Sequence, residues 1–212
     1  MGAVESAAQV SKRQEQWNSM PRVKLAPHHV ESCRLVVSRE ALLDGVPKGG
    51  RAAELGVAFG DFSSEILNRV RPDELHLIDM WEAERYSAGR AKVEEKFAKE
   101  IANGSVKRHV GSSLEMLGAF DDGFFDFIYI DTTHSYHLTL SELRLGARKL
   151  KPSGLLAGHD FCVGNVVKPV VYGVIQACHQ FCSEDGWRYR TISLDGGGSF
   201  SFCLERGYKR GE

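Results

Sequence analysis

The segment Ala53-Glu-Leu-Gly-Val-Ala-Phe-Gly-Asp-Phe-Ser-Ser64 decides the fold of this chain, together with the apolar run Leu75-His-Leu-Ile-Asp79 that follows it. The pattern predicts a strand that ends in an acid, a glycine turn that opens a helix, and a second strand that ends in another acid. The segment after the turn carries apolar residues at helical spacing: Phe62, Ile66, Leu67 and Val70. Such a unit is typical of parallel α/β sheets.

The glycine turn and the acid after the second strand predict a nucleoside site. Gly56 and Gly60 lack Cβ atoms, so a ligand can lie close to the backbone there. Asp79 would stand at the carboxyl end of the neighbouring strand, where a carboxylate can accept hydrogen bonds from both ribose hydroxyls. This geometry favours nucleoside recognition.

Missing motifs narrow the choice of nucleoside. The turn is Gly-x-x-x-Gly rather than the dinucleotide fingerprint Gly-x-Gly-x-x-Gly, and the chain has no Gly-Lys-Ser/Thr that would hold a triphosphate. Glu54, an acid at the turn, would repel a pyrophosphate but attract an ammonium or sulfonium ion. S-adenosylmethionine fits this pattern best, because it carries an adenosine, an α-ammonium and a positive sulfur.

From about residue 50 to 205 the chain resembles the class I S-adenosylmethionine-dependent methyltransferases. Four motifs carry the resemblance: Glu54-Leu-Gly-Val-Ala-Phe-Gly60, Asp79, Gly111-Ser-Ser113 and Phe125-Asp-Phe-Ile-Tyr-Ile-Asp131. Two further motifs are similar to the bacterial small-molecule branch called methyltransferase family 24: Ile130-Asp-Thr-Thr-His-Ser-Tyr136 and Gly154-Leu-Leu-Ala-Gly-His-Asp160. The order and spacing of these motifs make the resemblance specific.

Apolar runs and helical patterns alternate from residue 51 onward. Strands are predicted at 51–57, 74–79, 105–110, 124–130, 154–158, 187–194 and 199–204. Helices are predicted at 88–103, 136–150 and 168–182. The last two strands are joined by Asp195-Gly-Gly-Gly198, which is a hairpin signal. We expect a doubly wound, Rossmann-like α/β fold, with a seven-stranded, mostly parallel sheet that ends in an antiparallel hairpin.

The first 48 residues differ in character from the rest. Helical patterns at 4–17 and 29–43 are separated by a proline-containing stretch, and Asp44-Gly-Val-Pro-Lys-Gly-Gly50 contains several helix stop signals. We therefore expect an N-terminal helical cap or lid at 1–48 and a methyltransferase domain at 49–212. The cap helices are candidates for the interface of a homodimer.

Length and composition exclude several classes of partner. The 212 residues are 42% hydrophobic and 26% charged, with a formal net charge of −1, so they suit one soluble domain with a terminal extension. This charge removes the usual electrostatic reason to bind nucleic acid or an anionic membrane. No apolar run reaches the 18 residues of a membrane span. We expect a cytoplasmic protein with a small-molecule acceptor and five buried, free cysteines.

Ligands of open α/β sheets bind beyond the carboxyl ends of the strands. On this basis, and on the resemblance, the predicted residues for S-adenosylmethionine are Glu54, Leu55, Gly56, Phe59, Gly60, Phe62, Ser63, Asp79, Met80, Trp81, Gly111, Ser112, Ser113 and Asp131. Trp81 would cover the nucleoside face. For Ser112 and Ser113, a cap on the helix that follows is as well supported as contact with the ligand.

A second polar cluster comes from the ends of two strands that should be adjacent: Asp131, His134, His159 and Asp160. Carboxylates and imidazoles suit a divalent cation that acidifies a substrate hydroxyl. Similarity to catechol-type O-methyltransferases implies Asp131, His159 and Asp160 as metal ligands and His134 as the catalytic base. This chain has His159 and His134 where those enzymes use Asp and Lys, so the metal, for which Mg and Mn are the candidates, stays open. A scheme without metal stays open, because an unperturbed histidine has a pKa of about 6.5 and can act alone as the base. Asp131 is the second catalytic candidate, although it is also placed to cap the next helix.

These observations predict methyl transfer from S-adenosylmethionine to a hydroxyl oxygen of a small molecule. One alternative is a nicotinamide-dependent oxidoreductase, which the sheet pattern allows but the missing third glycine and Glu54 disfavour. Another is a module that binds S-adenosylmethionine without turnover. The polar cluster at Asp131 and His134 argues against that second alternative.

Overall fold

The computed structural model describes residues 6–167 and 169–207, and within them the central sheet has eight strands in the order β1-β9-β10-β6-β5-β2-β3-β4. The strands are β1 (Arg34–Val36), β2 (Arg51–Leu55), β3 (Glu74–Asp79), β4 (Val106–Val110), β5 (Phe125–Ile130), β6 (Leu150–Gly158), β9 (Trp187–Ser193) and β10 (Phe202–Arg206). Strands β2 to β6 run parallel to one another, and β10 is antiparallel to both of its neighbours. The predicted α/β class and the terminal hairpin are confirmed.

The eighth strand is β1, and it lies where a helix over 29–43 was predicted. That prediction is wrong: the segment forms the 3-10 helix η1 (Pro27–His29), then β1, then α2 (Arg39–Leu43). β1 pairs in parallel with β9, and the side chain of Ser38 caps α2 by accepting the N–H of Ala41. The proposed division at residue 48 stays a prediction; within its first part, residues 34–36 belong to the sheet, and Leu42 and Leu43 belong to the core.

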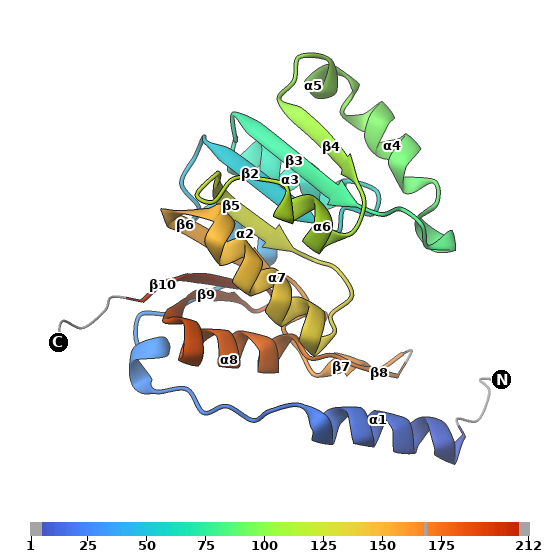
Figure 1. Ribbon diagram of the computed structural model, residues 1–212, viewed down its shortest axis with the longest axis vertical. Coiled ribbons are helices and arrows are strands. Elements are labelled where there is room, and N and C mark those ends of the chain that lie inside the picture. The colour runs from blue at the N-terminus through green and yellow to red at the C-terminus, as the bar shows by residue number, and fades with distance from the viewer. Residues whose placement is uncertain (1–5, 168, 208–212) are drawn as a thin grey trace.

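Helices cover both faces of the sheet (Figure 1). One buried cluster joins α6 (Ser113–Gly118), α7 (Tyr136–Lys149) and α8 (Val174–Asp185) to the sheet, and a second joins α2, α3 (Asp61–Arg69) and α4 (Gly89–Lys96). Successive residues of a strand point to opposite faces. Accordingly Ile128 and Ile130 of β5 lie in the first cluster, and Phe127 and Tyr129 lie in the second.

Two predicted helices differ from the observed elements. The pattern at 88–103 forms two helices, α4 and α5 (Ala98–Ala102), because the backbone leaves helical geometry at Phe97, whose ring is buried. The helix expected at 168–182 begins only at Val174; Lys168 lies outside the described residues, and Val170–Val171 form β8, which pairs with β7 (Gly164–Asn165). The predicted start of the first helix, Val4, also lies outside the described residues.

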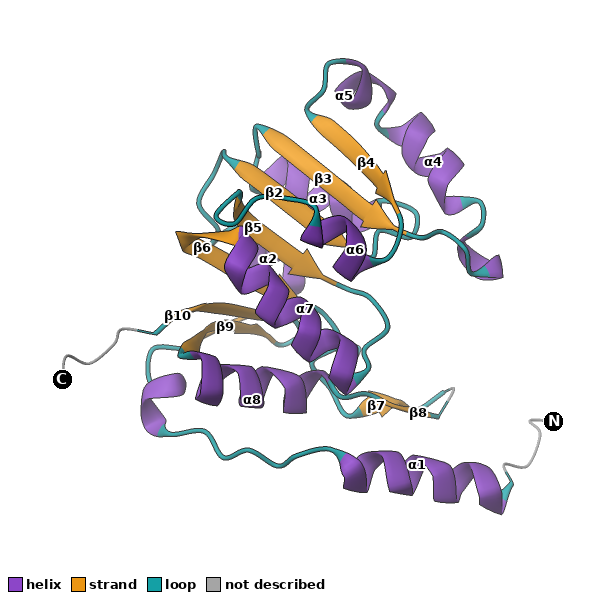
Figure 2. Cartoon of the chain, in the orientation of Figure 1, coloured by secondary structure: helices purple, strands orange, loops and turns teal. Residues whose placement is uncertain are grey.

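Helix α1 (Ala7–Ser19) and the β7–β8 hairpin lie together at the lower edge of the molecule (Figure 2). No helix among residues 6–167 and 169–207 is long and apolar enough to cross a membrane. The five cysteines are free, as expected, but only Cys178, Cys182 and Cys203 are buried. Cys33 and Cys162 are partly exposed, which corrects the expectation for those two.

Candidate active site

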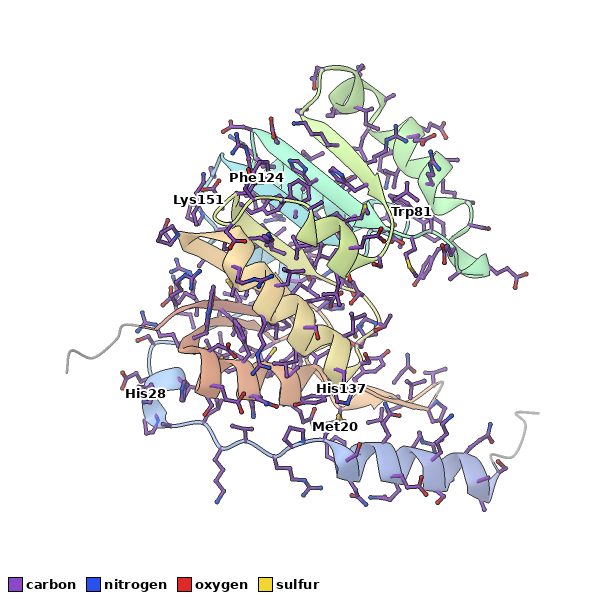
Figure 3. All side chains as sticks on the ribbon, viewed as in Figure 1. Met20, His28, Trp81, Phe124, His137 and Lys151 are labelled. Carbon is purple, nitrogen blue, oxygen red and sulfur yellow. The ribbon has the colours of Figure 1, made fainter. Side chains whose placement is uncertain are left out.

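A pocket of about 740 Å³ opens at the carboxyl ends of β2, β3, β4 and β5. Its walls come from the four loops that follow these strands, together with Arg39 of α2. The volume suits a small ligand, since such pockets usually span about 300–1,000 Å³. Figure 3 shows Trp81, a lining residue, at this end of the sheet, with Phe124 and Lys151 at the opposite end.

The carboxylate of Asp79 fixes the turn after β2. Its Oδ2 accepts the backbone N–H groups of Val57 at 2.8 Å and Ala58 at 2.9 Å, and its Oδ1 accepts the N–H of Trp81 at 2.8 Å. The indole Nε1 of Trp81 donates to the carbonyl of Ala58 at 2.8 Å. A carboxylate has about four acceptor positions and three are filled here, so Asp79 has about one position left for a hydroxyl donor from the pocket, rather than the two expected.

Close contacts within the protein require both turn glycines. Gly56 has φ of 84°, and a Cβ built there would lie 2.0 Å from the carbonyl oxygen of Asp131. A Cβ at Gly60 would lie 2.8 Å from the Phe97 ring. A ligand was expected to lie against the backbone at both glycines; Gly56 lines the pocket, whereas Gly60 is not among the lining residues.

Glu54 is a buried acid in the wall of the pocket. It is 1% exposed and accepts a hydrogen bond from the hydroxyl of Ser63 on α3. Burial raises the pKa of Glu54 to about 8, the Ser63 hydrogen bond opposes this shift, and the nearby negative charge of Asp131 adds to it. The carboxyl is therefore mostly protonated at neutral pH, and a cation in the pocket would favour its ionised form.

The predicted residues after β3 and β4 lie at the same end of the pocket. Met80, Trp81, Gly111, Ser112 and Ser113 all line it. Ser112 also caps α6, as expected, by accepting the N–H of Glu115 at 3.3 Å, and its contact with the donor stays a prediction. The hydroxyl of Ser113 donates to Glu142.

The opposite end of the pocket holds a cluster of two acids and an imidazole. Ligand atoms of Asp131, His134 and Asp160 all lie within 4.8 Å of one another. His134 Nε2 lies 3.1 Å from Asp160 Oδ2, and the ring of Tyr172 packs against His134 with centroids 4.7 Å apart. His134 and Asp160 have φ of 59° and 53°. Strained backbone of this kind is concentrated at functional sites.

Asp131 is a member of this cluster and lines the wall of the pocket. Burial raises its pKa to about 7, and the charge of Asp160 raises it further. The guanidinium of Arg39, with Nη1 3.9 Å from Asp131 Oδ2, lowers it. Asp131 therefore sits close to its titration point at neutral pH, where a ligand can change its charge.

The structure changes the predicted metal-ligand set. His159 lies outside the group formed by Asp131, His134 and Asp160, and its Nδ1 lies 2.8 Å from Ser201 Oγ. The N–H of His159 bonds to the carbonyl of Ile130 and so extends the β6 ladder, and adjacent residues of a strand point in opposite directions. His159 is thus bonded to Ser201, whereas His134 joins Asp131 and Asp160 in the group that could hold a metal.

The remaining predictions separate into lining and supporting residues. Of the predicted set, the pocket is lined by Glu54, Gly56, Phe59, Phe62, Asp79, Met80, Trp81, Gly111, Ser112, Ser113, Asp131 and His134. Leu55 and Ser63 are fully buried behind it. Asp160 contacts the site through His134.

Arg39 is a site residue that was not predicted from the sequence. Its guanidinium lies 4.4 Å from the centroid of the Phe62 ring and close to Asp131, at the wall of the pocket. A signal was present: Val36-Val37 followed by the potential N-cap Ser38 indicates a strand end and a helix start, which is the position of the other site residues.

Comparisons with known proteins place this geometry in a family. A structure from Corynebacterium glutamicum matches with a TM-score of 0.60 and 13% identity, over 99% of this chain and 94% of that chain. An S-adenosylmethionine-dependent methyltransferase from Aquifex aeolicus gives 0.57 and 17%, over 79% and 89%. A tRNA methyltransferase from Bacillus subtilis gives 0.55 and 17%, over 81% and 67%. At these identities the matches show a shared fold.

No curated protein matches the chain. The family model for the methyltransferase domain of family 24 matches residues 53–161, which contain every predicted site residue. The chain therefore belongs to the class I S-adenosylmethionine-dependent methyltransferases, in methyltransferase family 24.

Proposed function

We propose that this protein transfers the methyl group of S-adenosylmethionine to a hydroxyl oxygen of a small-molecule acceptor. One observation carries the proposal: a single pocket connects the Glu54 and Asp79 end with the Asp131 and His134 end. A donor bound along the first end would have its sulfur near the second. The acceptor would then meet the methyl group beside an acid and an imidazole.

The charge of the pocket supports a cationic donor. Among the described residues that line it, five are acids and one is an arginine: Glu54, Asp61, Asp79, Glu82, Asp131 and Arg39. An excess of acids stabilises the sulfonium and the α-ammonium of the donor and repels the pyrophosphate of a dinucleotide. Arg39 suits the donor's carboxylate, since a guanidinium matches that group's geometry.

The acceptor end supports proton removal from a hydroxyl. The imidazole of His134 takes the proton as the acceptor oxygen forms its bond to the methyl carbon and the carbon–sulfur bond breaks. The carboxylate of Asp160, 3.1 Å from Nε2, stabilises the imidazolium that results. General-base catalysis of this kind contributes about 10²- to 10⁴-fold in rate.

A divalent cation is the alternative way to ionise the acceptor. The donor set of Asp131, His134 and Asp160 fits such an ion, with mixed oxygen and nitrogen ligands that suit manganese as well as magnesium. When bound, the ion would supply positive charge that acidifies the acceptor hydroxyl. In that scheme His134 is a ligand and does not act as the base.

Calorimetry with S-adenosylhomocysteine and with NAD tests the donor. We expect the first compound to bind and to raise the melting temperature, and NAD to do neither. Family membership and the acidic lining both support this result. Stabilisation by NAD alone would overturn the proposal in favour of the oxidoreductase.

Labelled S-adenosylmethionine and a panel of phenols, catechols and aliphatic alcohols test the acceptor chemistry. We expect His134→Ala to reduce methyl transfer about 10²- to 10⁴-fold, because the base or the ligand is lost, while S-adenosylhomocysteine still binds. A chelator separates the two schemes: activity that is lost and then restored by Mg or Mn supports the metal, and unchanged activity supports His134 as the base. Binding without transfer to any acceptor would instead favour the non-catalytic module.

A further inference from the structure

A carboxyl group lies behind the pocket wall, between the two ends of the pocket. Glu142 of α7 has a relative exposure of 0% and is not among the lining residues. Its Oε1 accepts the hydroxyl of Ser113, and its Oε2 accepts the hydroxyl of Thr132 at 2.9 Å. One side chain thus holds two loops.

The two loops belong to different ends of the pocket. Ser113 follows β4, at the end proposed for the donor, and Thr132 follows β5 directly after Asp131, toward His134. Both partners of Glu142 line the pocket. The carboxyl group is therefore a short connection from the donor wall to the acceptor wall.

Packing alone does not account for an acid at this position. Among the described side chains, no lysine, arginine or histidine forms an ion pair with Glu142. Burial raises its pKa to about 7, and the hydrogen bonds from Ser113 and Thr132 oppose the shift. A buried acid without a cation is costly, and an apolar side chain would avoid that cost.

We propose that Glu142 is a positioning residue that couples the donor end of the pocket to the acceptor end through its two hydrogen bonds. A donor that orders the loop at Ser113 also fixes Thr132, and with it the loop that carries Asp131 and His134. The bound donor then prepares the acceptor site, which is an energetic coupling between two sites. This inference rests on the proposed function, because it takes the adenosyl group as the ligand beside Ser113.

Hydrogen exchange with and without S-adenosylhomocysteine tests the coupling. In the unmodified protein we expect the ligand to slow amide exchange about fivefold or more in both segments, residues 111–116, which include the start of α6, and residues 131–136. In Glu142→Leu, slowing should persist at 111–116 and be lost at 131–136. Glu142→Gln should behave like the unmodified protein, since its amide can accept from Ser113 and donate to Thr132.

Thr132→Val provides a second route if Glu142→Leu does not fold. Valine has about the volume of threonine but lacks the hydroxyl that donates to Glu142, and the hydrogen bond from Ser113 to Glu142 is kept. The slowing of exchange at 131–136 by the ligand should therefore again be lost. Slowing at 131–136 that survives in both Thr132→Val and a folded Glu142→Leu overturns the coupling. The coupling is also overturned if, in the unmodified protein, the ligand slows exchange at 111–116 but not at 131–136. Failure of the unmodified protein to bind S-adenosylhomocysteine would instead reject the proposed function.

Discussion

Gly56→Ala should be among the most destabilising single substitutions in this protein. The alanine would adopt a left-handed conformation, and its Cβ would lie 2.0 Å from the backbone carbonyl of Asp131, which has no flexible end to move away. The two effects together should lower the free energy of unfolding by about 2–5 kcal/mol. For a chain of this size the melting temperature should fall by at least about 5 °C.

Gly104→Ala is the matched control. Gly104 has φ of 82°, but a Cβ there would meet no atom within 4 Å. An alanine there would still adopt the unfavourable left-handed conformation but would meet no clash. We therefore expect the free energy of unfolding to fall by about 1 kcal/mol and the melting temperature by about 2–4 °C. Thermal unfolding of both variants measures the difference. Equal losses would show that the approach of the β2 turn to the end of β5 does not require a glycine.

Gly56 also illustrates what sequence patterns can and cannot predict. The strand ends at Glu54, Asp79 and Asp131 were predictable, because apolar runs and turn residues are local signals and parallel strands bring their carboxyl ends together. The reason for Gly56 was not predictable. It depends on the distance to Asp131, 75 residues away in the chain.

The place of His159 outside the group of possible metal ligands, and the place of Arg39 in the pocket wall, depend on long-range contacts of the same kind. Which of two adjacent residues faces the site depends on whether the strand ladder continues, and the N–H of His159 extends it. Arg39 depends on β1 pairing with β9, a contact between residues more than 150 positions apart. Local propensity contains no information about such a pairing.

Glu54→Gln should stabilise the protein at alkaline pH and weaken donor binding. The pKa of Glu54 is raised from 4.5 to about 8, chiefly by burial. Between these values the unfolded chain has released a proton that the folded chain keeps, so the free energy of unfolding falls as the pH rises. Across this interval the free energy of unfolding falls by at most about 1.4 kcal/mol per pH unit, and above pH 8 it falls no further on account of Glu54.

The variant lacks this ionisation, so its stability relative to the unmodified protein should increase between pH 5 and pH 8.5. Chemical unfolding at several pH values measures the change. Asp131 and Glu142 also have raised pKa values, but they are present in both proteins and largely cancel in the difference. Glu95→Gln, at an exposed position on α4, should show no such trend.

Binding of S-adenosylhomocysteine should change in the opposite sense. The ligand's ammonium favours the ionised form of Glu54, so binding to the unmodified protein should strengthen toward pH 8 and release a proton into the buffer. Glu54→Gln should bind about ten- to hundredfold more weakly at pH 8, which is the value of one charge-assisted hydrogen bond, and should release less proton. Calorimetry in buffers of different ionisation enthalpy measures both quantities.

A variant that is more stable at pH 8.5 yet binds as tightly as the unmodified protein would show that the buried acid does not contact the ammonium. A variant that loses both stability and binding would show instead that Glu54 serves the fold through Ser63.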